Sequence, residues 1–116
     1  MTNQLTYPRI ILPEEIGEDI PEIEAQEWFG AKVELENGDR YTLNFYTPFR
    51  LSQDLDYSIE GGEPWLAEFN VIVVPQVTLK AAKECVQALW QQGYFKFLKS
   101  DDEMLLARQQ MRGRSQ

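Results

Sequence analysis

The fold is decided by the stretch AKVELENGDRYTLNFYT, residues 31–47. Apolar and polar residues alternate on both sides of Asn37 and Gly38, which is the pattern of two strands joined by a tight turn. A two-residue turn would place apolar residues opposite polar ones, which a half-buried sheet resists. A three-residue loop that begins at Glu36 keeps the apolar side chains together and puts Gly38 at the left-handed position of the turn.

This loop fixes the register of the predicted hairpin. Val33 pairs with Tyr41 and Ala31 pairs with Leu43, so that one face of the hairpin is apolar. Because side chains alternate between the two faces of a strand, Tyr46 lies on the opposite face from this apolar set. We therefore expect Tyr46 to be a surface aromatic residue.

The hairpin is followed by a predicted helix. Thr47-Pro48 has the residue types of an N-cap and of the first helical position. Leu51, Leu55 and Ile59 recur at intervals of four residues and form a single apolar stripe. Gly61-Gly62 ends the helix. The spacing predicts a short amphipathic helix that packs along its stripe.

A strand and a longer helix come next. Residues 70–74, NVIVV, form a continuous apolar and β-branched run, which predicts a central strand covered on both faces. Thr78 then caps an amphipathic helix over residues 79–92, and Gly93 ends it. We expect this helix to lie on the sheet and to close the core.

The two ends of the chain carry weaker signals. Residues 7–12, YPRIIL, predict an edge strand, and residues 14–28 predict an acidic connecting loop with apolar anchors. Residues 94–98 fit either a final strand or a packed turn. Ser100 followed by Glu103 three residues later is a capping box, which predicts a short helix through residue 111.

This order of elements predicts an α+β fold. The expected order is strand, acidic loop, β-hairpin, helix, strand, helix and a short C-terminal helix, with a mainly antiparallel sheet and helices packed on one face. The length of 116 residues fits one domain. We expect residues 1–111 to form it and residues 112–116 to be a frayed tail.

Composition narrows the classes of function. The formal net charge is −8, which disfavours binding to nucleic acid or to anionic membranes. The longest apolar run, residues 69–75, is too short to span a bilayer. The chain begins without a signal-peptide pattern and contains one cysteine, Cys85, so the sequence predicts a soluble cytoplasmic protein without disulfides.

The sequence offers little for chemistry. It contains no histidine, the most frequent general base and zinc ligand. Cys85 flanks the apolar arc of its helix, as expected of a packing residue. Asp54 and the alternating acidic residues after it resemble a calcium loop, but Ile59 and Trp65 occupy the positions that need glycine and glutamate. We therefore predict no metal, no cofactor and no enzymatic activity.

The first functional hypothesis is a non-enzymatic protein-binding module, such as a small inhibitor or an immunity-like protein. Residues 1–70 carry 15 acidic and four basic side chains, a net charge of −11. This charge would favour encounter with a basic protein. The candidate contact residues are acidic or aromatic: Glu14, Glu15, Glu18, Asp19, Glu22, Glu24, Glu27, Trp28, Tyr46, Asp54, Asp56, Glu60, Glu63 and Trp65.

The alternative hypothesis is a self-associating structural or accessory domain that forms a homodimer. Residues 70–74 or 94–98 would supply an apolar seam, or the edge strand at 7–12 would recruit a second strand. An enzyme is the weakest hypothesis, because only carboxylates, tyrosines, lysines and one cysteine are available for chemistry.

Overall fold

The computed structural model describes residues 7–12 and 25–114 of the chain. Its strands are β1 (Arg9–Ile11), β2 (Trp28–Glu34), β3 (Arg40–Tyr46) and β4 (Val71–Val73). Its helices are α2 (Pro48–Glu60), α3 (Leu79–Gln91) and α4 (Asp101–Arg114), with a short 3₁₀ helix at Tyr94–Phe97. The α+β class predicted from the sequence is confirmed.

The four strands form one mixed sheet in the order β1-β2-β3-β4. The first three strands are antiparallel, and β4 runs parallel to β3. The predicted hairpin register is confirmed, since Val33 pairs with Tyr41 and Ala31 pairs with Leu43. Gly38 has φ of 91°, a left-handed conformation that glycine adopts without steric cost. The predicted edge position of β1 is also confirmed.

The prediction that residues 70–74 form a central strand is wrong. Only Val71–Val73 pairs, and it lies at the edge of the sheet beside β3. The Val73 side chain is 52% exposed. After β3 the chain passes through α2 and returns to pair in parallel with β3. Within the described residues, β4 therefore has a neighbouring strand on one side only. An apolar run does not reveal this position, so the sequence suggested a central strand.

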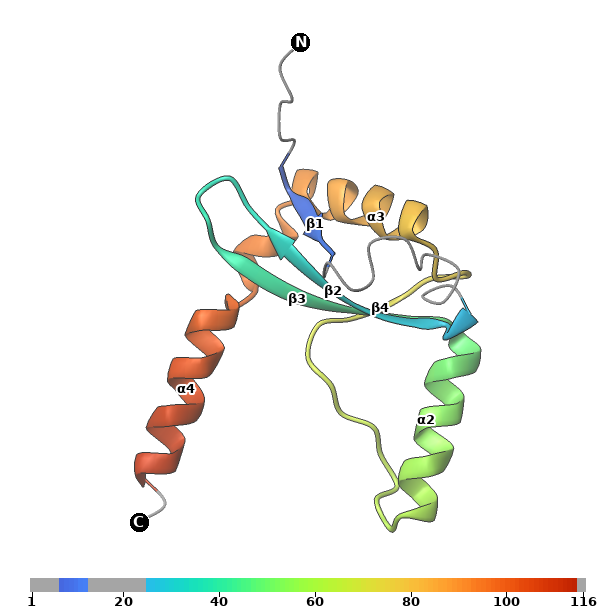
Figure 1. Cartoon of the computed structure of the whole chain (residues 1–116). Coiled ribbons are helices and arrows are strands. Elements are labelled where there is room, and N and C mark those ends of the chain that lie inside the picture. The colour runs from blue at the N-terminus through green and yellow to red at the C-terminus, as the bar shows by residue number, and fades with distance from the viewer. Residues whose placement is uncertain (1–6, 13–24, 115–116) are drawn as a thin grey trace.

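The core lies between one face of the sheet and α3 (Figure 1). Its strand residues come from the apolar face of β2 and β3, and α3 contributes Leu79, Ala82 and Val86. The predicted cap of α3 is confirmed, because the Thr78 hydroxyl accepts a hydrogen bond from the Ala81 amide at 3.0 Å. One helix therefore closes the hydrophobic core.

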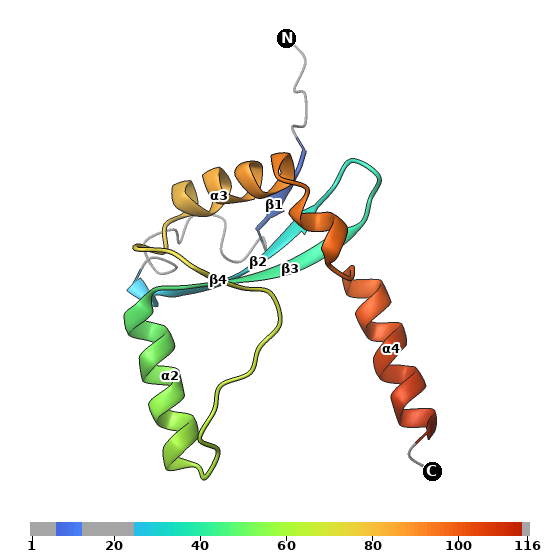
Figure 2. The same cartoon turned by 180° about the vertical axis from the view of Figure 1, so that it is seen from behind.

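The other two long helices leave the sheet on the opposite side from α3. Figures 1 and 2 show α2 and α4 pointing away from the sheet in a similar direction, with residues 61–70 between them. Packing on the core face, expected for all helices, therefore holds for α3. The predicted cap of α2 is confirmed, since the Thr47 hydroxyl accepts a hydrogen bond from the Arg50 amide at 3.1 Å. No side chain of α2 is buried.

Residues 94–98 form a packed turn and not a strand. The 3₁₀ helix Tyr94–Phe97 buries Phe95, whose ring packs edge-on against Tyr41 with 5.3 Å between ring centroids. The predicted capping box is confirmed by two hydrogen bonds between Ser100 and Glu103, each from a backbone amide to the other side chain. These bonds lower the pKa of Glu103. α4 thus begins where the sequence indicates.

Candidate functional site

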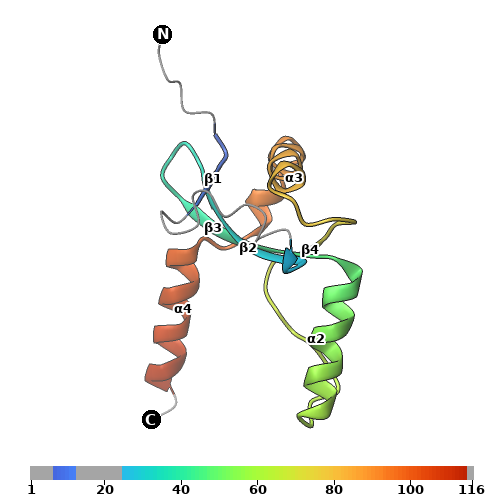
Figure 3. The same cartoon turned by 45° about the vertical axis from the view of Figure 1, so that its right-hand side comes forward.

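The candidate site is the face of the sheet that α3 leaves uncovered. We call it the open face. It is bounded by α2 on one side and by α4 on the other, as Figure 3 shows from an oblique direction. Because side chains alternate along a strand, the residues of β2 and β3 that do not enter the core point to this face. They are Trp28, Gly30, Lys32, Glu34, Arg40, Thr42, Asn44 and Tyr46.

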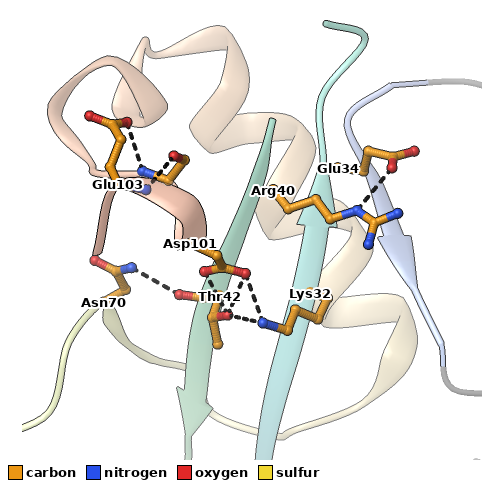
Figure 4. A network of polar contacts seen from close by, with 8 residues as sticks. Lys32, Glu34, Arg40, Thr42, Asn70, Asp101 and Glu103 are labelled. Atoms are coloured by element: carbon orange, nitrogen blue, oxygen red, sulfur yellow. Dashed lines mark hydrogen bonds and ion pairs between the residues drawn. The ribbon is translucent and has the colours of Figure 1, made fainter. Parts of the chain in front are cut away.

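A polar network joins α4 to the open face (Figure 4). The Lys32 ammonium lies 2.7 Å from Asp101 Oδ2 and donates a hydrogen bond to Thr42 Oγ1 at 3.0 Å. The Thr42 hydroxyl donates in turn to Asp101 Oδ1 at 3.0 Å. Lysine and carboxylate neutralise each other here, so the network is suited to fixing the first turn of α4 and not to acid–base chemistry.

A second cluster of ion pairs connects β1, β2 and β3. Glu34 on β2 accepts hydrogen bonds from Arg9 on β1 at 2.6 Å and from Arg40 on β3 at 3.1 Å. The contact with Arg40 appears in Figure 4. The hydrogen bonds from Arg9 and then Arg40 hold the pKa of Glu34 below its ordinary value. This cluster is structural, because each charge has a partner.

Two asparagines hold the end of residues 61–70 against the open face through hydrogen bonds. Asn44 donates from its side chain to the Phe69 carbonyl at 2.9 Å, and its backbone amide donates to the Asn70 carbonyl at 2.9 Å. Asn70 has φ of 53° and returns a side-chain hydrogen bond to the Thr42 carbonyl at 2.9 Å. The Phe69 backbone is therefore held in place, while its side chain stays 66% exposed.

Tyr46 is buried, so the prediction that it is a surface aromatic residue is wrong. It is only 2% exposed, because α2 begins directly after it and Trp28 packs beside it, with 6.5 Å between the ring centroids. Burial raises the pKa of Tyr46, and the Glu68 carboxylate raises it further. Tyr46 therefore lies close to Glu68 of residues 61–70.

Trp28 is the first residue of β2 and does not lie in the predicted loop. Gly30 breaks the apolar alternation that identifies the rest of the strand, yet the backbone pairing continues to Trp28. The Trp28 ring occupies the space above Gly30, where an added Cβ would lie 3.2 Å from it. The Arg50 guanidinium lies 6.0 Å from the centre of the same ring.

A groove of about 580 Å³ runs between α4 and residues 67–70. Its floor is polar and comes from Lys32, Thr42 and Asn44. Its walls carry both apolar and charged side chains: Ala67, Glu68, Phe69, Met104, Leu105 and Arg108. The groove therefore has a polar floor between walls that are partly apolar.

Exposed apolar side chains are concentrated on the elements around the open face. Seven of the ten large apolar side chains that are exposed among the described residues belong to α2, residues 61–70 and α4. We call these seven the apolar surface: Phe49, Tyr57, Ile59, Trp65, Phe69, Leu105 and Leu106. Their exposed fractions range from 50% for Ile59 to 66% for Tyr57 and Phe69.

The structure brings several predicted contact residues to the same side of the sheet. Asp56, Glu60 and Glu63 are exposed on α2 and directly after it, and Trp65 is 57% exposed. Asp54 is paired with Arg50 at 3.0 Å. Glu27 precedes β2 in a left-handed conformation. The remaining predicted residues lie outside the described part of the chain: Glu14, Glu15, Glu18, Asp19, Glu22 and Glu24.

Sequence reasoning missed part of the apolar surface. Phe49 is 64% exposed and was not among the predicted contact residues. Its position off the stripe of Leu51, Leu55 and Ile59 is a usable signal, because these residues project from a different side of the helix. Phe69 and the two leucines of α4 carry no comparable signal in the sequence.

The remaining candidate chemistry concerns metal ligands and the single cysteine. No cluster of three or more cysteine, aspartate or glutamate side chains in 7–12 and 25–114 could hold a metal ion. Burial raises the pKa of the Cys85 thiol, which packs against the core. No helix in the described part of the chain is long and apolar enough to cross a membrane.

Comparison with known proteins gives no functional assignment. Protein-family models, curated proteins and solved structures were searched, and none of them matches this chain. The candidate site is therefore defined by its own geometry.

Proposed function

We propose that this chain is a non-enzymatic protein-binding module, and that its partner presents basic and apolar side chains. A small inhibitor or an immunity-like protein is the functional type that fits best. A cytoplasmic location is part of the proposal and rests on the single cysteine. The net charge of −8 supports a protein partner over nucleic acid or an anionic membrane.

The apolar surface carries the proposal. An amphipathic helix of a monomeric domain normally buries its apolar stripe against the domain itself. No side chain of α2 is fully buried: Leu51 and Leu55 of its stripe are half-buried and Ile59 is 50% exposed. Neighbouring segments on the same side of the sheet expose Trp65 and Phe69 as well. Contiguous exposed apolar side chains with polar neighbours are typical of interaction sites.

The support beneath Phe69 favours binding over chance exposure. Asn44 and Asn70 fix the backbone at the Phe69 carbonyl and at the following residue through three hydrogen bonds. An anchor that is already ordered loses little conformational entropy when it binds. Aromatic side chains held in this way are the usual hot spots of protein interfaces.

Charge defines the chemistry of the partner. α2 and residues 61–70 carry five acidic side chains and one basic side chain, a net charge of −4. Complementary charge accelerates encounter and suppresses incorrect partners. A partner with lysines or arginines around apolar side chains therefore fits this surface.

The test is affinity capture from a lysate of the source cells, with the full chain immobilised at low density. We expect wild type to retain a protein in stoichiometric amount and Phe69→Ala to lose most of it. Phe97→Ala is the matched control, because Phe97 is 87% exposed but lies outside the apolar surface. Glu63→Lys and Glu84→Lys form a second matched pair, on residues 61–70 and on α3.

The two matched pairs of variants test whether capture depends on the apolar and acidic surface. Loss of the captured protein with Phe69→Ala and Glu63→Lys, but not with the two controls, would support it. Equal capture by all four variants, or no stoichiometric protein with wild type, would overturn it. Circular dichroism of each variant confirms that the fold is retained.

A further inference from the structure

The chain itself contains a helix with the chemistry expected of the partner. After Glu103, α4 carries three arginines and no acidic residue: Arg108, Arg112 and Arg114. The same helix exposes Leu105 by 55% and Leu106 by 56%. The part of α4 that follows Glu103 is thus basic and exposes two leucines, although the acidic first turn makes the whole helix neutral. It projects from a body whose neighbouring surface is acidic and apolar.

Within one chain, α4 does not cover the exposed apolar side chains of α2 and residues 61–70. Residues 61–70 lie between α2 and α4 (Figures 1 and 3). Residues 67–70 line the groove together with residues of α4. Leu105 lines this groove, whereas Leu106 does not belong to its lining and remains exposed. The apolar side chains of both helices are therefore free to meet a second molecule.

The dimensions of the two helices match. α2 has 13 residues and α4 has 14 residues, so that each is about 20 Å long at 1.5 Å per residue. Both project from the same face of the sheet (Figure 2). Two copies brought together with their open faces opposed can interdigitate these helices, and a two-fold axis makes both contacts identical.

We propose that a second copy of this chain occupies the apolar surface, with α4 of each copy packed against α2 and residues 61–70 of the other. The two sheets would then enclose four helices. This inference rests on the proposed function, because it assigns an occupant to the same surface. A different protein partner would have to displace α4 of the second copy.

The segments that would form the interface contain more residues than a standard interface uses. A standard interface uses roughly 20–30 residues from each partner. α2 and α4 already contain 13 and 14 residues, and residues 61–70 add to them. The opposite charges, −4 on α2 with 61–70 and +3 on α4 after Glu103, set the orientation of the two copies.

The first measurement is light scattering on a sizing column over a range of protein and salt concentrations. We expect twice the chain mass of 13.5 kDa, with a dissociation constant that rises with salt. Leu106→Glu should weaken the dimer by about tenfold or more, because it places a charge in an apolar contact. Phe97→Glu is the matched control and should leave the mass unchanged.

A charge exchange between two variants tests the pairing of α4 with α2. One variant carries Arg108→Glu and Arg112→Glu, and the other carries Asp56→Lys and Glu60→Lys. Each variant alone should be monomeric, since its like charges repel. Their mixture should form a heterodimer, detected by native mass spectrometry.

The outcomes separate this inference from the proposed function. A wild type that is monomeric at every concentration would overturn the proposed dimer. A dimer that neither Leu106→Glu nor the charge exchange alters would overturn the proposed interface. If a monomeric wild type still captures a different protein through Phe69, the proposed function stands and only the dimer fails. A heterodimer in the charge exchange would support the inference directly.

Discussion

At the scale of single residues, Thr42 occupies the junction between the sheet and α4. Its hydroxyl accepts a hydrogen bond from Lys32 and donates to Asp101, both at 3.0 Å. Its carbonyl accepts the side-chain hydrogen bond of Asn70. One residue thereby positions both sides of the groove.

Removing this hydroxyl should lower the stability of the protein. We expect Thr42→Val to reduce the free energy of unfolding by about 1 kcal/mol relative to Thr42→Ser, because serine keeps the hydroxyl and valine does not. Urea unfolding followed by tryptophan fluorescence measures the difference. Equal stability of the two variants would show that the network contributes nothing.

Glu34 should make stability depend on pH. Its pKa in the folded protein is lowered by Arg9 and Arg40, so its contribution is present above the ordinary value of 4.5 and is lost as the pH falls through the folded value. Wild type should therefore exceed Glu34→Gln in stability at neutral pH. The difference should shrink steadily below pH 4.5.

The control for Glu34 is Glu36→Gln, at an exposed residue of the hairpin turn. Its effect on stability should be small, because the Glu36 side chain is exposed. Urea unfolding at several pH values measures both curves. A gap between wild type and Glu34→Gln that does not narrow in acid would contradict this interpretation of the cluster.

At the scale of elements, the sequence predicted the features that depend on neighbouring residues, namely the register of the hairpin and the starts of the helices. The hairpin register follows from alternation around Gly38, and the starts of α2, α3 and α4 follow from Thr47, Thr78 and Ser100. These features depend on residues a few positions apart, so the sequence displays them directly.

The sides on which the elements lie could not be predicted in the same way. The stripe of Leu51, Leu55 and Ile59 indicates a helix with an apolar side, but periodicity does not say what covers that side. An apolar run likewise does not distinguish the edge strand β4 from a central strand. For the candidate site, the sequence indicated Trp65 and the acidic residues, whereas Phe69 became apparent only from the asparagine contacts.

The helices should differ in local stability. In dilute solution, amide hydrogens of α2 and of the outer turns of α4 should exchange faster than those of α3. The reason is that α3 buries Leu79, Ala82 and Val86, whereas α2 buries no side chain. Hydrogen exchange followed by mass spectrometry checks this order, and similar protection of α2 and α3 under dilute conditions would contradict it.

At the scale of the whole molecule, the hydrophobic core and the proposed binding surface lie on opposite sides of one sheet. The buried cluster lies on the side of α3, and the apolar surface lies on the side of α2 and α4. Truncations on the two sides should therefore have different effects, even when the side chains removed are of similar size.

Leu43→Ala and Phe69→Ala provide this comparison. Leu43 is fully buried, so its truncation should lower the free energy of unfolding by about 3 kcal/mol. Phe69 is 66% exposed, and its truncation should change stability by about 0.5 kcal/mol or less. Chemical denaturation measures both values. A large loss with Phe69→Ala would mean that this side chain belongs to the core.

The alternation of side chains along β2 and β3 has a consequence for how this protein can evolve. Neighbouring residues of β2 and β3 are under different constraints, because alternate side chains fill the core and the others lie on the open face. Under the proposed function, substitutions at open-face positions change the surface offered to a partner, while their neighbours in sequence preserve the core. An inserted residue would exchange the two sets, so new specificities are reached by replacement and not by changes in strand length.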